Sequence, residues 1–276
     1  MLSKKERFFA AAEELRALVC PRCGGDLSRR GDSLVCLRGH CLDVSRRGTV
    51  NVLSDSRRED YTEPLFAARR RIFGAGFYQP VCDALESLIP PGPATVLDAG
   101  CGEGWYLNRL LQREDRRGAG IDLSADAVRL ASDLPCRAVW CVGDLRRMPF
   151  RDGSFSVILD VLTPAAYDEF ERLLTRDGVL LKVYPGREYL KEIRAARGLP
   201  PYEEGGVEKW LRGRMRLRET RRVTIACPVT PDQWRDWVRM TPMNRDLSEA
   251  ETEALARAAA GTVTLDLHVA AAVRGE

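Results

Sequence analysis

The most informative segment of this 276-residue chain runs Val96-Leu97-Asp98-Ala99-Gly100-Cys101-Gly102-Glu103-Gly104-Trp105-Tyr106. An apolar run ends in an acid, three glycines follow at alternate positions, and a helical pattern continues to Leu111. This order predicts a strand, a tight turn and a helix N-terminus, because glycine permits positive φ and close approach of a ligand. The free N–H groups of such a helix start attract an anionic group, so the turn alone does not name the ligand.

Two further acids stand where the next strands are expected to end. Asp122 follows Ala119-Gly120-Ile121, where a carboxylate can accept hydrogen bonds from ribose hydroxyls. Asp144 follows a third apolar run, 138–142, and Leu123 and Leu145 come directly after the two acids. With Met148-Pro149-Phe150 and the apolar strand 156–159, this order resembles the class I S-adenosylmethionine-dependent methyltransferases. The resemblance implies an α/β fold with a Rossmann-like, doubly wound sheet. It also implies cofactor contacts by Asp98, Gly100, Gly102, Asp122, Leu123, Asp144 and Leu145, with Asp144 beside the adenine.

Four of the nine cysteines cluster near the N-terminus, in Cys20-Pro21-Arg22-Cys23 and in Cys36-Leu37-Arg38-Gly39-His40-Cys41. A Cys-x2-Cys pair on a tight turn and a second pair about 13 residues on predict a zinc ribbon with four protein ligands, hence a structural site. His40 and Cys41 are adjacent, so the spacing leaves the fourth ligand open.

Composition favours a cytoplasmic α/β protein with a small appended domain. No apolar run approaches the roughly 20 residues of a membrane span, and the N-terminus lacks the apolar segment of a secretory signal. A net charge of +3 means that any nucleic-acid surface must be local. We expect an N-terminal helix in 1–19, the ribbon in 20–53 with its last strand at 49–53, linker and helices in 54–94, and the methyltransferase domain in 95–276.

Two groups of arginines are candidates for RNA contacts. Arg69, Arg70 and Arg71 cannot all share one face of the helix expected from 64 to 73, so they are either solvated or partly in contact with phosphate. Four arginines at positions 212, 214, 216 and 218 alternate with other residues. An extended segment would place all four on one face, as a phosphate-binding row or a solvated sheet edge.

Taken together, the motifs resemble one family over nearly the whole chain from about residue 20. They are the Cys-Pro-x-Cys and Gly-His pairs, Gly48-x-Val50-Asn51, the segment from Ala68 to Pro80, the glycine-rich turn, Pro185-Gly186 and Met240-Thr241-Pro242. This set is similar to that of the bacterial 23S rRNA (guanine-N1)-methyltransferases, which include macrolide-resistance members. The resemblance implies zinc ligands Cys20, Cys23, Cys36 and His40, and cofactor contacts by Tyr78, Glu103, Gly104 and Tyr189.

The expected activity is methylation of guanine N1 in a hairpin of 23S rRNA. Guanine N1 must lose its proton, and Asp160, at the end of the fourth strand, is the candidate catalytic base. The following Thr163-Pro164-Ala165 departs from the more polar run of the family. A small-molecule or peptide methyltransferase is therefore the alternative, and a non-catalytic zinc-ribbon RNA-binding protein is a third hypothesis. No membrane partner is expected, and a homodimer is compatible with the sequence.

Overall fold

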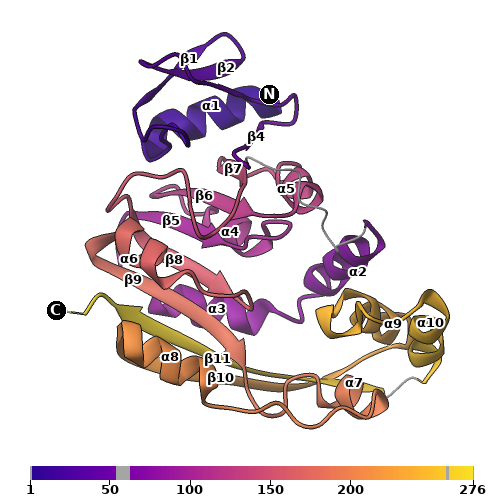
Figure 1. The fold of residues 1–276 in the computed structure, drawn as a ribbon. Coiled ribbons are helices and arrows are strands. Elements are labelled where there is room, and N and C mark those ends of the chain that lie inside the picture. Colours follow the sequence, from indigo (N-terminus) through magenta and orange to yellow (C-terminus); the bar gives the residue numbers. More distant parts are fainter. Residues whose placement is uncertain (1, 54–62, 259–260, 276) are drawn as a thin grey trace.

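The computed structural model describes residues 2–53, 63–258 and 261–275, which build one large sheet, helices on both of its faces and a small N-terminal sheet (Figure 1). The large sheet has eight strands in the order β10-β11-β9-β8-β5-β6-β7-β4. Its strands are β4 (Thr49–Asn51), β5 (Ala94–Ala99), β6 (Arg116–Asp122), β7 (Val139–Val142), β8 (Phe155–Val161), β9 (Leu174–Pro185), β10 (Arg216–Pro228) and β11 (Thr262–Val273). The small sheet contains β1 (Leu27–Arg30), β2 (Ser33–Cys36) and β3 (Cys41–Asp43).

Strand direction confirms the predicted doubly wound α/β architecture. The strands from β4 to β9 pair in parallel, whereas β11 pairs antiparallel with both β9 and β10. The chain proceeds from β5 to β6 on one side and returns to β8 on the other side of β5. Ligands of such sheets bind beyond the carboxyl ends of the strands at this reversal of order.

Helices cover both faces of the large sheet and complete two apolar cores. The helices are α1 (Lys4–Leu15), α2 (Glu63–Gly74), α3 (Gln79–Leu88), α4 (Trp105–Leu110), α5 (Ala125–Ala131), α6 (Tyr167–Leu173), α7 (Lys191–Ala196), α8 (Gly206–Arg214), α9 (Pro231–Met240) and α10 (Glu249–Arg257), with a 3-10 turn at Pro242–Asn244. The core on one face contains buried side chains of α2, α3, α4, α7 and α9, and the core on the other contains those of α1, α6 and α8. No helix in the described ranges combines the length and the apolar character needed to span a bilayer.

The N-terminal region is joined to the large sheet more closely than the sequence indicated. Helix α1 buries Phe8 and Phe9 and packs against β6 and β7. Segment 49–53, predicted as the last strand of the ribbon, is wrong in that role, because β4 pairs in parallel with β7 at the edge of the large sheet. The expected linker at 54–62 lies outside the described residues.

The expected row of four arginines on one extended face is also wrong. Arg212 and Arg214 belong to helix α8, and strand β10 begins only at Arg216. Buried Met215 separates the two elements, so the alternation in sequence crosses a helix–strand boundary. Arg212 is paired with Glu208 one helical turn earlier at 2.6 Å.

Candidate functional site

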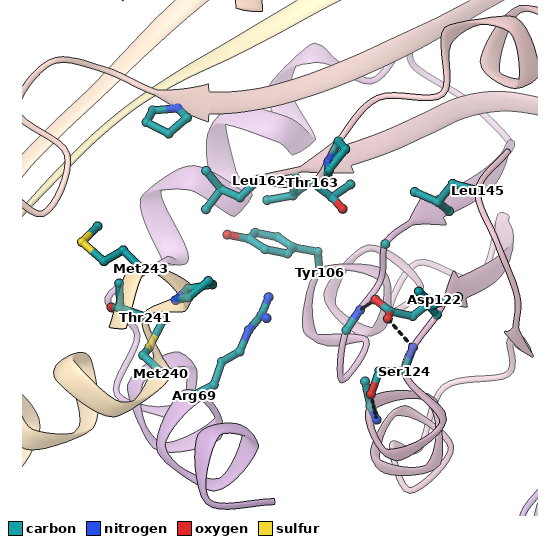
Figure 2. A pocket seen from close by; sticks show the side chains of 18 of the residues that line it. Arg69, Tyr106, Asp122, Ser124, Leu145, Leu162, Thr163, Met240, Thr241 and Met243 are labelled. Carbon is teal, nitrogen blue, oxygen red and sulfur yellow. Dashed lines mark hydrogen bonds between the residues drawn. The ribbon is translucent and has the colours of Figure 1, made fainter. Parts of the chain in front are cut away.

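A cavity of about 670 Å³ opens at the carboxyl ends of the parallel strands (Figure 2). Its walls are the glycine-rich turn after β5, the ends of β6 and β7, the loop after β8, helix α2, and the segment from Met240 to Met243 that follows α9. In Figure 2, Asp122 and Leu145 lie on one side of the cavity and Met240, Thr241 and Met243 on the other. The cavity is thus built by elements from both ends of the chain.

Two positions of the glycine-rich turn require glycine, because any Cβ there would collide with neighbouring side chains. Gly100 has φ 76°, and a Cβ there would lie 2.8 Å from Cγ2 of Thr163. Gly104 also has φ 76°, and a Cβ there would lie 2.5 Å from the Trp140 ring. Gly100 and Gly102 line the cavity, whereas Gly104 lies behind it as the N-cap of α4.

Asp122 is held in position at the end of β6. Its two carboxylate oxygens accept hydrogen bonds from the backbone N–H groups of Gly102 and Ser124, both at 2.8 Å. Burial raises the pKa of Asp122, and these two amides act in the opposite direction by stabilising the carboxylate. Each oxygen keeps a second lone pair, so the side chain can also accept hydrogen bonds from a diol.

The other predicted residues of this region fall into two groups. Leu123, Asp144 and Leu145 line the cavity beside Asp122. Asp98 does not line it: the side chain is only 2% exposed, and burial and the nearby charge of Asp122 raise its pKa to about 7. Asp98 therefore lies beneath the glycine-rich turn and does not contact a ligand in the cavity directly. Glu103 is 5% exposed and likewise lies behind the cavity wall.

Arg69 is a site residue that motif reasoning did not identify as such. It extends from α2 into the cavity, where Figure 2 shows it below Tyr106, and its Nε lies 3.4 Å from Oε2 of Glu103. Within the described part of the chain, Arg69 Nε, both carboxylate oxygens of Glu103 and the Tyr106 hydroxyl are buried without a hydrogen-bond partner. Buried polar atoms in folded proteins are rarely left without partners, so this cluster is suited to a polar ligand.

The three adjacent arginines of α2 have three different environments. Arg69 faces the cavity, Arg70 is exposed, and Arg71 donates two hydrogen bonds to Asp236 of α9. A signal for Arg69 was present in the sequence, because it stands one helical turn before Phe73, which also lines the cavity.

Tyr78 and Tyr189, both predicted from the family resemblance, meet inside the cavity. Their hydroxyl oxygens lie 3.0 Å apart although the residues are 111 positions apart in sequence. Burial raises the pKa of both side chains, so both stay neutral and keep their O–H donors at physiological pH.

Asp160, the predicted catalytic base, is not placed for that role. Its side chain is fully buried, is absent from the cavity wall and pairs with Lys182 Nζ at 2.8 Å. Burial raises the pKa of Asp160 to about 6, against the opposing charge of Lys182. Lys182 also donates to the carbonyl oxygen of Thr163 at 2.5 Å. This pair therefore positions the loop after β8, and Asp160 cannot contact a substrate directly.

That loop and the segment after β9 form the remaining walls. Leu162 and Leu190 line the cavity with φ of 56° and 53°, a conformation that is unfavourable for non-glycine residues. Such backbone strain is concentrated at functional sites. Thr163, Pro164 and Ala165, the run that departs from the family pattern, also line the cavity.

A second candidate site lies in the N-terminal region. Sulfur atoms of Cys20, Cys23 and Cys36 and a ring nitrogen of His40 all lie within 4.8 Å of one another. His40 Nδ1 is 3.5 Å from the sulfurs of both Cys20 and Cys36, and the Cys23 and Cys36 sulfurs are 3.8 Å apart. Thiolates at Zn–S distances of about 2.3 Å in a tetrahedron lie about 3.8 Å apart, so this donor set fits zinc. Cys41 is exposed, and its sulfur faces Asp43 instead.

Comparisons with known proteins agree with this geometry. Residues 96–178 match the family described as "Methyltransferase domain". A crystal structure of the [4+2]-cyclase SpnF has the same fold, with a TM-score of 0.50, 17% identity and coverage of 71% of this chain and 82% of that one.

Three curated relatives carry closely similar names. A putative 23S rRNA (guanine-N1)-methyltransferase of Bacillus subtilis is 42% identical over 63% of this chain and 66% of its own length. The 23S rRNA (guanine(748)-N1)-methyltransferase of Streptomyces fradiae is 34% identical over 76% of this chain and 81% of its own. A putative 23S rRNA (guanine-N1)-methyltransferase of Micromonospora griseorubida is 30% identical over 85% and 93%. The fold and family expected from the sequence are thereby confirmed, and the chain belongs to the 23S rRNA (guanine-N1)-methyltransferase family.

Proposed function

We propose that this protein transfers a methyl group from S-adenosylmethionine to N1 of a guanine in a hairpin of 23S rRNA. The observation that carries the proposal is a buried polar cluster: Arg69 and Tyr106 line the cavity with Asp122, and Glu103 lies behind Arg69. The family relationship adds the substrate class, because three relatives are named for this reaction.

The polar groups fit the two ends of the methyl donor. Asp122 would accept hydrogen bonds from the ribose hydroxyls, and Leu123 and Leu145 would flank the adenine. At the other end, Arg69 would bind the carboxylate of the methionine part, and Glu103 would hold the guanidinium in place from behind the cavity wall. Arg69 Nε lacks a hydrogen-bond partner among the described residues, and the carboxylate of the methyl donor would supply one.

Bound S-adenosylmethionine supplies an already activated methyl group, so the task of the protein is to orient the acceptor. The acceptor base would enter between the loop from Leu162 to Ala166 and the segment from Met240 to Met243. A base in a folded hairpin must be turned out of its stack to reach such a cavity. A zinc ion held by Cys20, Cys23, Cys36 and His40 would stabilise the small ribbon sheet and take no part in the transfer.

The test uses 23S rRNA from cells that lack the protein, with radiolabelled methyl donor. We expect label in 23S rRNA and a reverse-transcription stop at one guanine, because a methyl group on N1 blocks base pairing. Asp122→Ala should abolish both labelling and cofactor binding in calorimetry. Intact cofactor binding with no label in any RNA fraction would refute RNA methylation and favour a small-molecule or peptide substrate. Absence of cofactor binding by the wild-type protein would leave the non-catalytic alternative.

A further inference from the structure

A second hollow of about 680 Å³ adjoins the cavity. Arg146, Tyr202 and the loop from Thr163 to Ala166 line both spaces, so the two are neighbours that share one wall. The outer part of the hollow is formed by α8, which contributes Val207, Trp210 and Arg214. A chain segment that enters the cavity past this loop would therefore run across α8.

Trp210 is unusually exposed for a tryptophan. Its side chain is 70% exposed, whereas Trp140, Trp234 and Trp237 are at most 3% exposed. The next residue, Leu211, is fully buried and anchors α8 to the sheet. Helix α8 thus presents an indole ring to solvent at the edge of the hollow. Aromatic rings exposed beside a substrate channel are the usual platforms on which unpaired bases stack.

Two arginines line the same hollow as this ring. Arg214 lies one helical turn after Trp210 and is 3.2 Å from Asp168, with side chains 46% and 82% exposed. Arg146 pairs with Asp144 at 2.6 Å, and its side chain is 70% exposed. The exposed Arg214–Asp168 pair contributes little to stability, so a phosphate group can replace that carboxylate, and Arg146 can contact the same phosphate while it stays paired with Asp144. Another acid of the hollow, Glu169, is already neutralised by Arg172.

We propose that this hollow binds the nucleotide next to the target guanine, with its base stacked on Trp210 and its phosphate between Arg146 and Arg214. This inference rests on the proposed function, since it requires an RNA strand whose target base occupies the cavity. The shared wall of the two spaces, the exposed indole ring and the two arginines of the hollow together favour a nucleotide strand over a free small molecule.

The first measurement is binding of a labelled single-stranded oligoribonucleotide to the full-length protein by fluorescence anisotropy. Trp210→Ala should weaken binding about tenfold, which is the effect expected when one base–aromatic stack is lost. Trp210→Phe keeps an aromatic ring and should retain most of the affinity. Leu2→Ala is the control: it removes another exposed apolar side chain, 58% exposed, that lines neither the cavity nor the hollow, and it should leave the oligonucleotide affinity unchanged. In methylation of 23S rRNA, Trp210→Ala should raise the KM for RNA with little change in S-adenosylmethionine affinity.

The outcomes separate this inference from the proposed function. If the wild-type protein methylates RNA and Trp210→Ala leaves both oligonucleotide affinity and KM unchanged, the subsite is refuted and the function stands. If no RNA is methylated but oligonucleotide binding depends on Trp210, the proposed function fails and the stacking surface stands. If Trp210→Ala changes only the sedimentation of the protein from dimer to monomer, a second copy of the chain covers the ring and the inference is wrong.

Discussion

At the scale of single residues, the pairing of Arg69 with Glu103 makes the methionine end of the cavity testable. Arg69→Met should weaken S-adenosylmethionine binding about 10- to 100-fold, because a charge-assisted hydrogen bond to a carboxylate is lost. Methylthioadenosine lacks that carboxylate, so calorimetry should find its affinity for wild type and variant nearly equal. Arg70→Met is the matched control, since Arg70 is exposed on the same helix. An equal loss for both ligands would mean that Arg69 supports only the fold.

Asp98 gives a second residue-scale prediction, on stability against pH. Its pKa is raised to about 7 by burial and then by Asp122, whereas an unfolded aspartate titrates near 4. Between these values the unfolded chain has released the proton and the folded chain keeps it. The free energy of unfolding therefore falls as pH rises, by about 1.4 kcal/mol for each pH unit.

Asp98→Asn removes this titration. The variant should gain stability over wild type by roughly 2 kcal/mol between pH 5 and 7, with little further gain at pH 8. Urea unfolding at these pH values measures the difference, and Asp126→Asn, at a half-exposed acid of α5, controls for general charge effects. A difference between Asp98→Asn and wild type that is constant over this range would show that Asp98 is ionised in the folded protein.

At the scale of elements, the fourth zinc ligand of the ribbon can be tested, because His40 and Cys41 are adjacent in the sequence. His40→Ala should release zinc during dialysis against a chelator, whereas Cys41→Ser should keep one zinc per chain, because only His40 faces the three sulfurs. The zinc content per chain of each variant is measured by mass spectrometry. The affinity for S-adenosylmethionine should change less than about twofold in both variants, since the cluster is not part of the cavity. Equal zinc loss in both would contradict this ligand set.

The elements also show what could be predicted from sequence. The strands that end at Asp122 and Val142 were found because a buried parallel strand leaves a continuous apolar run. The partner of β4 could not be found, because short strands near a ribbon have the same local pattern whichever sheet they join. The arginine row from 212 to 218 failed for a related reason: alternation fits a strand, but tertiary burial of Leu211 and Met215 continues α8 to Arg214.

The site, like the elements, could be predicted only in part. Gly100, Gly102, Asp122 and Asp144 could be expected at one cavity because the carboxyl ends of parallel strands share one edge of the sheet, whereas the burial of Asp98 and Glu103 could not be read from their spacing. Asp160 was misassigned, since position at a strand end does not reveal that Lys182 on the neighbouring strand would pair with it. Trp210 carried no motif, and its significance comes only from its exposure beside the cavity.

At the scale of the whole molecule, the cavity is closed by segments that lie far apart in the chain. Helix α2 contributes Arg69, and the end of α9 contributes Met240. Figure 1 shows α2 beside α9, away from the N-terminal ribbon. Arg71 Nε and Nη2 donate to the two oxygens of Asp236 at 2.7 and 2.6 Å, and the Trp237 ring packs against Tyr78. The helix from the N-terminal third is thereby fixed to the C-terminal region around the cofactor site.

This contact should couple the two walls of the cavity. Arg71 does not line the cavity, yet Arg71→Ala should weaken S-adenosylmethionine binding about three- to tenfold by loosening the helix that carries Arg69. Asp236→Ala should do the same, and the double variant should be no worse than either single one, because both remove one bidentate pair. Calorimetry measures the affinities, and hydrogen exchange of α2 should rise in each variant. Additive losses would show that the two residues act on the site separately, and Arg70→Ala, which breaks no contact with α9, should bind as tightly as wild type.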